Sequence, residues 1–282
     1  MAQFTKSLLC TAAFAATAVV AFAAPASAGD LFGRRDGGSI KDAPAEEPRR
    51  CSFSVNIAGT TDYVFRGISQ NLEDPTVQGG GDATCGMFYA GVWASGVDFV
   101  PGSNGTGSGD GYVEVDLYAG IKPTWGPLTF DLGVIYYAYP GGESLAQFDG
   151  SLNKLDYVEL KLGASGTWNN FTVGGTAFWS PDYYGGSESV VTLEGTAAYT
   201  FAAIGPVTPT ISALIGTSIG DDPAFTFAFG GDYVYWNAGV ALAVDKFTFD
   251  FRYWGTDNDL PFYEAIGVVD DRFVFTAKVT LP

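Results

Sequence analysis

The feature that most constrains the fold is a two-residue alternation of apolar and polar side chains that recurs along the chain. Between Phe53 and Phe65 the odd positions are mostly apolar and the even positions mostly polar. The same split returns from Phe247 to Tyr253 and near the end of the chain. Successive side chains of a β-strand point to opposite faces, so each such segment predicts a strand with one apolar and one polar face.

The lengths of the connections indicate how these strands are arranged. We expect twelve strands, over 52–67, 76–84, 87–99, 111–123, 127–139, 154–167, 170–180, 188–201, 206–219, 230–244, 246–255 and 271–281. The connections after even-numbered strands are short, whereas those after odd-numbered strands are longer. This layout is typical of outer-membrane barrels, with short periplasmic turns and longer extracellular loops. The sequence therefore predicts an all-β, transmembrane antiparallel β-barrel rather than a soluble sandwich or lipocalin-like barrel.

Aromatic residues concentrate near the two ends of the expected strands, as in the aromatic girdles of membrane barrels. Those expected at the loop ends are Tyr63, Phe65, Tyr136, Tyr139, Trp179, Tyr253 and Trp254. Those expected at the turn ends are Phe171, Tyr199, Phe201, Phe247 and Phe273.

The first fifty residues differ in composition from the rest of the chain. Residues 1–28 combine Lys6, an apolar stretch and the small residues Ala26, Ser27 and Ala28, which is the pattern of a cleaved signal peptide. Residues 29–50 are rich in both charges and poor in apolar residues, which predicts a flexible charged periplasmic tail. The barrel then occupies 51–282, and we expect the protein to be integral to the bacterial outer membrane after export.

Two cysteines remain after the expected signal peptide, Cys51 before the first strand and Cys85 at the first short turn. Both are expected on the periplasmic side, where oxidising conditions favour pairing. A disulfide is the favoured interpretation, and two free thiols are the alternative.

Charge and composition exclude several functions. The chain has no His, which removes Ser-His-Asp and Cys-His catalysis and His-ligated zinc, so we expect no metal site and no cofactor. Its formal net charge of -17 opposes nucleic-acid binding. Paired carboxylates could support glycoside hydrolysis, with Glu114, Asp116 and Asp131 as candidates. Such carboxylates are ordinary in the interior of barrels, however, so we expect no enzymatic activity.

If the apolar faces contact lipid, the polar faces line the lumen of the barrel. Twelve tilted strands give a backbone diameter of roughly 24 Å, and side chains reduce the opening to about 10 Å or less. The expected pore-lining residues are Asp62, Arg66, Tyr89, Trp93, Glu114, Asp116, Tyr118, Asp131, Glu159, Lys161, Glu194, Asp250, Arg252, Arg272 and Lys278. Opposite charges among them could also pair and fill the lumen.

The motif from Thr61 to Gln70, the run from Pro75 to Gly80 and the run from Tyr89 to Ser95 resemble the proteobacterial TorF-type porins, also known as the Gcw_chp domain of unknown function. The resemblance continues through 114–120, 136–140 and 255–257 and covers most of 51–282. Thr61 stands where the family pattern has Ser. The resemblance implies an outer-membrane barrel and does not imply a substrate.

The sequence thus predicts a porin-like channel for passive diffusion of small hydrophilic solutes. Acidic residues in the outer loops would attract cations, so we expect a weak cation preference. The expected partners are outer-membrane lipid and lipopolysaccharide, with no oligomeric state indicated. The alternative is a barrel closed by its own salt bridges that has a structural or surface-interaction role through its acidic outer loops.

Overall fold

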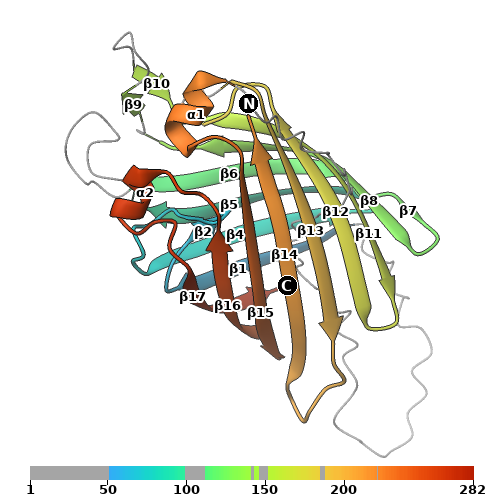
Figure 1. The fold of residues 1–282 in the computed structure, drawn as a ribbon. Helices are drawn as coiled ribbons and strands as arrows, with labels where there is room; N and C mark the ends of the chain where they lie inside the picture. Colours follow the sequence, from blue (N-terminus) through green and yellow to red (C-terminus); the bar gives the residue numbers. More distant parts are fainter. Residues whose placement is uncertain (1–50, 99–111, 141–142, 146–151, 185–187, 221) are drawn as a thin grey trace, which may run out of the picture.

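A computed structural model describes residues 51–98, 112–140, 143–145, 152–184, 188–220 and 222–282, and the expected signal peptide and charged tail lie outside these residues. Its main feature is a closed barrel of twelve long strands, each paired antiparallel with its two neighbours (Figure 1). Pairing of the first long strand with the last closes the barrel. The long strands are β1 (Cys51–Thr60), β4 (Thr76–Cys85), β5 (Phe88–Val97), β6 (Tyr112–Ile121), β8 (Leu128–Ala138), β11 (Tyr157–Trp168), β12 (Phe171–Ser180), β13 (Val190–Thr200), β14 (Thr208–Ile219), β15 (Tyr233–Val244), β16 (Phe247–Thr256) and β17 (Arg272–Leu281). The predicted fold class and strand number are confirmed.

Seven short elements lie between the long strands. They are β2 (Val64–Phe65), β3 (Ile68–Ser69), β7 (Thr124–Trp125), β9 (Glu143–Leu145), β10 (Leu152–Lys154), α1 (Pro223–Phe229) and α2 (Pro261–Ala265). Strands β2 and β3 pair only with each other, as do β9 and β10. Neither helix in the described part of the chain is long and apolar enough to cross a membrane.

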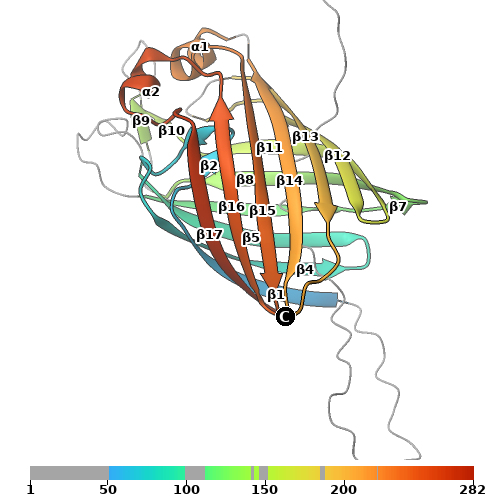
Figure 2. The same ribbon diagram turned by 60° about the horizontal axis from the view of Figure 1, so that its bottom comes forward.

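The two ends of the barrel differ, as the connection lengths predict. At one end, which we call the turn end, the strands are joined by the short connections 86–87, 122–127, 169–170, 201–207 and 245–246. Each short connection contains one residue with positive φ, which Gly, Asn and Asp adopt most readily: Gly86, Gly126, Asn169, Gly205 and Asp245. The opposite end, which we call the loop end, carries the longer connections together with α1 and α2 (Figure 2).

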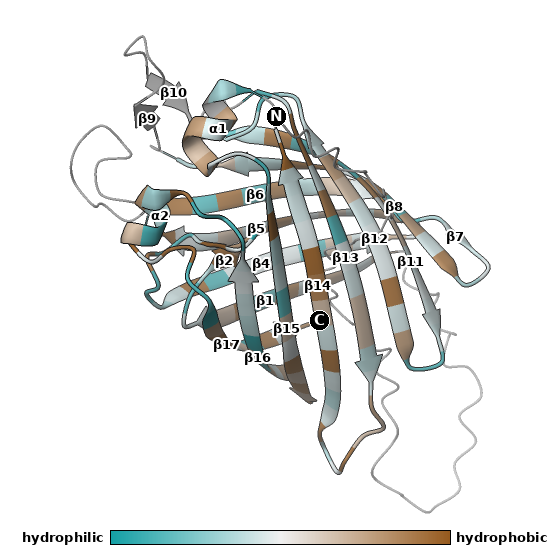
Figure 3. Ribbon diagram, in the orientation of Figure 1, coloured by the Kyte–Doolittle hydropathy of each residue, from teal (hydrophilic) through white to brown (hydrophobic). Residues whose placement is uncertain are grey.

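The outer wall of the barrel is apolar. Large apolar side chains alternate along the strands and remain exposed, among them Phe53 at 68%, Leu162 at 60% and Phe273 at 81%. The hydropathy pattern shows the same apolar bands along β12 and β14 (Figure 3). A monomeric soluble protein rarely exposes such a continuous apolar surface, whereas a membrane barrel places it against lipid.

Several of the predicted girdle positions are wrong. Tyr139 is buried with other aromatic rings at the loop end. Trp254 shares the inward face of Arg252, because residues two apart on a strand point to the same side. Phe273 pairs with Tyr253 near the loop end and not near a turn.

The first predicted strand, 52–67, is too long. Strand β1 ends at Thr60, and the chain then leaves the barrel wall until β4 begins at Thr76. Tyr63 and Phe65, which were expected in the outer girdle, and Asp62 and Arg66, which were expected on the inner face of this strand, all lie in the departing segment.

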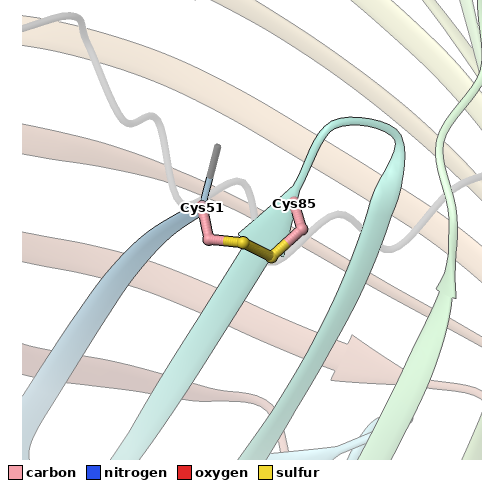
Figure 4. The surroundings of a disulfide bond; sticks show 2 residues. All are labelled: Cys51 and Cys85. Carbon is pink, nitrogen blue, oxygen red and sulfur yellow. A yellow bond between two sulfur atoms is a disulfide. The ribbon is translucent and has the colours of Figure 1, made fainter. Parts of the chain in front are cut away.

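The disulfide prediction is confirmed. Cys51 and Cys85 are directly opposite each other in the register of β1 and β4, with their Cα atoms 4.2 Å apart (Figure 4). The bond therefore connects two neighbouring strands at the turn end of the barrel.

Candidate functional site: a plugged barrel lumen

The strand register places the predicted lining residues in three parts of the barrel interior. In the plug segment described below lie Asp62 and Arg66. On the strands of the loop-end half lie Trp93, Glu114, Asp116, Glu159, Lys161, Glu194, Arg252 and Arg272, with Lys161 and Arg252 close to mid-strand. On the strands of the turn-end half lie Tyr89, Tyr118, Asp131, Asp250 and Lys278. All of the strand residues share the inward face of their strands.

Residues 61–75, which we call the plug segment, fold into the loop end of the lumen. A short hairpin of β2 and β3 forms its centre, and the backbone N–H of Gln70 donates to the carbonyl of Tyr63 at 2.7 Å. Its buried side chains are Asp62, Tyr63, Arg66, Ile68, Ser69 and Asn71. The polar groups of this buried loop are shielded from water, so they need hydrogen-bond partners on the barrel wall.

The strongest of these contacts joins Arg66 to Glu159 on β11. Two guanidinium nitrogens of Arg66 donate to the two carboxylate oxygens of Glu159 at 2.7 and 2.8 Å. The side chains are 3% and 2% exposed. Arg66 also donates to the Tyr183 hydroxyl at 3.3 Å, and Glu159 accepts from the Tyr137 hydroxyl at 3.1 Å. This bidentate geometry, shielded from water, connects the tip of the plug segment to the opposite wall.

Two further contacts hold the base of the plug segment. Asp62 accepts from Ser69 at 2.7 Å and from Arg272 on β17 at 2.9 Å. The Tyr63 hydroxyl donates to the Glu114 carboxylate on β6 at 2.7 Å. Burial raises the pKa of the Tyr63 phenol, and the negative charge of Glu114 raises it further, so Tyr63 keeps its proton and remains a donor.

Gly67 makes the turn of the plug segment possible. Its φ is +82°, and a Cβ atom at this position would lie 2.7 Å from Cβ of Tyr235 and 2.9 Å from Cβ of Thr256. Only glycine fits both the backbone conformation and the space against the wall. The Arg-Gly pair at 66–67 is therefore determined by the way the segment packs.

Aromatic rings cover the plug segment at the loop end, and we call this group the aromatic cap. The Tyr137 and Tyr157 rings stack at 4.3 Å, and Tyr157 contacts the Tyr183 ring edge-on at 4.7 Å. Tyr183 in turn packs against Phe229 of α1 at 5.6 Å. Together with Tyr139, Tyr184 and Phe225, these residues form an apolar cluster over the lumen.

From the middle of the barrel to the turn end, the lumen is polar and more accessible. Lys161 donates to Asp131 at 2.7 Å, and their side chains are 17% and 16% exposed. On the facing wall Arg252 pairs with Asp250 at 2.9 Å. Tyr89 and Tyr118 donate to Asp131 and Asp82, respectively. Lys278 lies on the same inner face, opposite Thr248 and Ala58 in the register.

Carboxylates outnumber cationic groups among the predicted lining residues in both halves of the barrel. The loop-end half has the carboxylates of Asp62, Glu114, Asp116, Glu159 and Glu194 against the cationic groups of Arg66, Lys161, Arg252 and Arg272. The turn-end half has Asp131 and Asp250 against Lys278. Within the described residues, no group of three or more Cys, Asp or Glu side chains is arranged to hold a metal ion.

A comparison with protein-family models matches residues 44–281 to the Gcw_chp family of bacterial proteins of unknown function. The chain belongs to this family. A search of curated proteins finds no match for the chain.

Solved structures resemble the barrel. The solved structure of KdgM porin has a TM-score of 0.50 and 8% identity, with 81% of this chain and 98% of that chain covered. LpxR from Salmonella typhimurium has a TM-score of 0.42 and 10% identity, covering 81% and 99%. OmpT of Vibrio cholerae, described as expressed in the outer membrane, has a TM-score of 0.38 and 11% identity, covering 82% and 97%. At these identities the KdgM likeness concerns the fold alone, which is that of an outer-membrane porin barrel.

Proposed function

We propose that this Gcw_chp protein is an outer-membrane channel for passive diffusion of small hydrophilic solutes. The observation that carries the proposal is the closed barrel with an apolar outer wall and a charged, partly exposed inner wall between the plug segment and the turn end. Lipid explains the outer wall, whereas inward charges that water can reach suit the passage of polar solutes. The TorF-type porin resemblance agrees with this proposal.

We propose a weak preference for cations. Carboxylates outnumber cationic groups among the predicted lining residues in both halves of the barrel, including the loop-end half, where the plug segment narrows the lumen. A narrow passage with low-dielectric walls concentrates the counter-ion of its lining charge. Acidic residues in the described loops, including Asp182, Asp257 and Asp259, add to the same field.

A second candidate is a closed barrel with a structural or surface-interaction role, and the packing at the plug segment favours it. Arg66, Glu159 and Glu114 are all nearly inaccessible to solvent. In this candidate the salt bridges fill the lumen permanently, and the acidic outer loops make the functional contacts.

The proposal includes the orientation of the channel in the outer membrane. After removal of the signal peptide, the turn end and the Cys51–Cys85 bond would face the periplasm, while the loops would face lipopolysaccharide and the medium. Small hydrophilic solutes would be the ligands, with no cofactor, no nucleic acid and no catalysis.

The test is single-channel recording from the refolded mature protein in a planar bilayer, with potassium chloride gradients to measure the reversal potential. We expect discrete steps and a reversal potential on the cation-selective side. Asp116→Asn should reduce this selectivity, whereas Asp245→Asn, which removes the same charge from an exposed turn, should leave it nearly unchanged. Anion selectivity of the unaltered protein would contradict the proposed cation preference.

A further inference from the structure

We propose that the plug segment is a gate, docked in the lumen in the closed arrangement and released in the open one, with the Arg66–Glu159 pair as its latch. This inference rests on the proposed channel function and adds the way in which the channel opens.

The docked arrangement closes the lumen at the level of Arg66. Wall residues from five different strands at this level are at most 2% exposed: Ser95, Glu114, Glu159, Thr192 and Tyr235. A water-sized sphere therefore does not reach the wall there, although it reaches Lys161 and Arg252 further toward the turn end. Passage of a hydrated ion through this level requires the plug segment to move.

The plug segment can move without breaking the barrel. Its strands β2 and β3 pair only with each other and add no strand to the barrel sheet. Three backbone hydrogen bonds connect it to the surrounding chain: Thr61 to Phe275, Ser69 to Val268, and Asp98 to Gln70. Its two ends meet at Thr60 and Thr76, which are opposite each other in the register of β1 and β4. The segment is thus a flap with both ends fixed at one place on the wall.

The docked backbone is strained. Arg66, Leu72 and Glu73 have φ values of 50°, 51° and 66°, and these three are half of the six non-glycine residues with positive φ in the described chain. Each such residue raises the free energy of the docked form. Undocking relieves this strain, so side-chain contacts with the wall must supply the free energy that keeps the segment in place.

Arg66 is the contact best suited to be the latch. It is the plug residue that reaches across to β11, and its guanidinium lies 4.7 Å from the Phe65 ring and 5.2 Å from the Phe178 ring. Removing one partner of this pair leaves an uncompensated buried charge in the docked form, whereas each charge is hydrated in the undocked form. The pair therefore allows docking only while both residues are present.

Thiol labelling measures the opening directly. Ile68 is 7% exposed inside the plug segment, so Ile68→Cys reports undocking through its reaction with a water-soluble maleimide. The native cysteines of the barrel are joined in a disulfide and do not react. We expect Arg66→Met or Glu159→Gln in this background to raise the labelling rate by at least about tenfold, since each leaves a buried group without its partner.

Two matched controls separate gating from general damage. Arg252→Met removes an inward arginine near mid-strand whose hydrogen bonds go to Asp250, Asn237 and Ser212 rather than to the plug segment, and it should leave the labelling rate of Ile68→Cys unchanged. Asp259→Cys, at an exposed loop position, should react at the same rate in all backgrounds. Folding of each variant is checked by the heat-dependent mobility of the barrel on gels.

Conductance then distinguishes failure of the gate from failure of the channel. In one variant the plug segment, residues 61–75, is replaced by a two-residue Asn-Gly turn that connects Thr60 to Thr76, which are opposite each other on β1 and β4. We expect this variant to conduct continuously and the Arg66→Met variant to show a higher open probability than the unaltered protein. If the replaced variant conducts but Arg66→Met and Glu159→Gln label and conduct like the unaltered protein, the latch is refuted. If the folded replaced variant is silent, the channel function itself is refuted.

Discussion

The Arg66–Glu159 pair allows a quantitative prediction of stability. In Arg66→Met the Glu159 carboxylate keeps only the Tyr137 hydroxyl, at 3.1 Å, while its side chain is 2% exposed. Breaking a buried pair by removing one partner costs about 3–5 kcal/mol, which changes the folding equilibrium by roughly two to four orders of magnitude. Glu159→Gln leaves Arg66 unpaired and should cost a similar amount. The double variant has no buried charge at this site and should fall within about 1 kcal/mol of the unaltered protein.

The assay is denaturant unfolding of the four proteins in lipid vesicles, followed by tryptophan fluorescence. Glu73→Gln is the matched control, because Glu73 also contacts an arginine, Arg272 at 3.1 Å, but its side chain is 48% exposed. An exposed pair contributes at most about 1 kcal/mol, so this variant should unfold almost like the unaltered protein. Single variants that each lose less than 1 kcal/mol, or a double variant that loses the sum of both, would refute the assignment of this pair as a buried, coupled contact.

Three further results are expected. Leu162→Arg places a charge on the lipid-facing wall near the middle of β11 and should lower the free energy of unfolding by about 2–4 kcal/mol. Lys161→Arg, on the inner face, should have little effect. Equal effects would mean that the apolar wall does not face lipid. Replacing both Cys51 and Cys85 by Ser removes a cross-link with a sequence separation of 34 residues and should lower the free energy of unfolding by up to about 4 kcal/mol in the same assay. Chemical reduction of the unaltered protein should lower it by the same amount. An unchanged free energy of unfolding in both cases would contradict the expected stabilisation. The Cβ of Gly91→Val would lie 2.5 Å from the Tyr118 ring, so this variant should displace the ring from Asp82 and lower the free energy of unfolding by about 1–3 kcal/mol. In the control Gly86→Ala no atom lies within 4 Å of the new Cβ, and only the positive φ matters. An unchanged stability of Gly91→Val would show that the ring is not confined there.

The barrel wall could be predicted from the sequence because each strand has a single lipid-facing side. A wall of this kind favours apolar residues at every second position, as from Phe247 to Tyr253, whereas on β4 the same face carries the small residues Gly79, Gly81 and Ala83. Glycine, asparagine and aspartate mark the turns for an equally local reason, since Gly86 and Asn169 supply positive φ. The disulfide followed from this topology, because the paired strands bring Cys51 opposite Cys85.

The plug segment could not be predicted in the same way. Its sequence continues the alternation of β1 through Phe65, but Tyr63 and Phe65 pack inside the barrel against Trp93 and Tyr137 instead of facing lipid. Both environments favour aromatic rings, so the pattern does not distinguish them. The partners of its charges are also distant in sequence: Arg66 binds Glu159, and Asp62 binds Arg272. The one local signal is Gly67, directly after Arg66. A glycine at this point indicates that the strand ends there.

The central claim is that the lumen conducts once the plug segment leaves it. The most direct measurement is single-channel conductance of the unaltered protein and of the variant in which an Asn-Gly turn replaces 61–75, both in the same bilayer and the same potassium chloride gradient. The account predicts intermittent steps from the unaltered protein and a steady, cation-preferring conductance from the variant. A silent bilayer from the variant, with its folding shown by heat-dependent mobility, would contradict it.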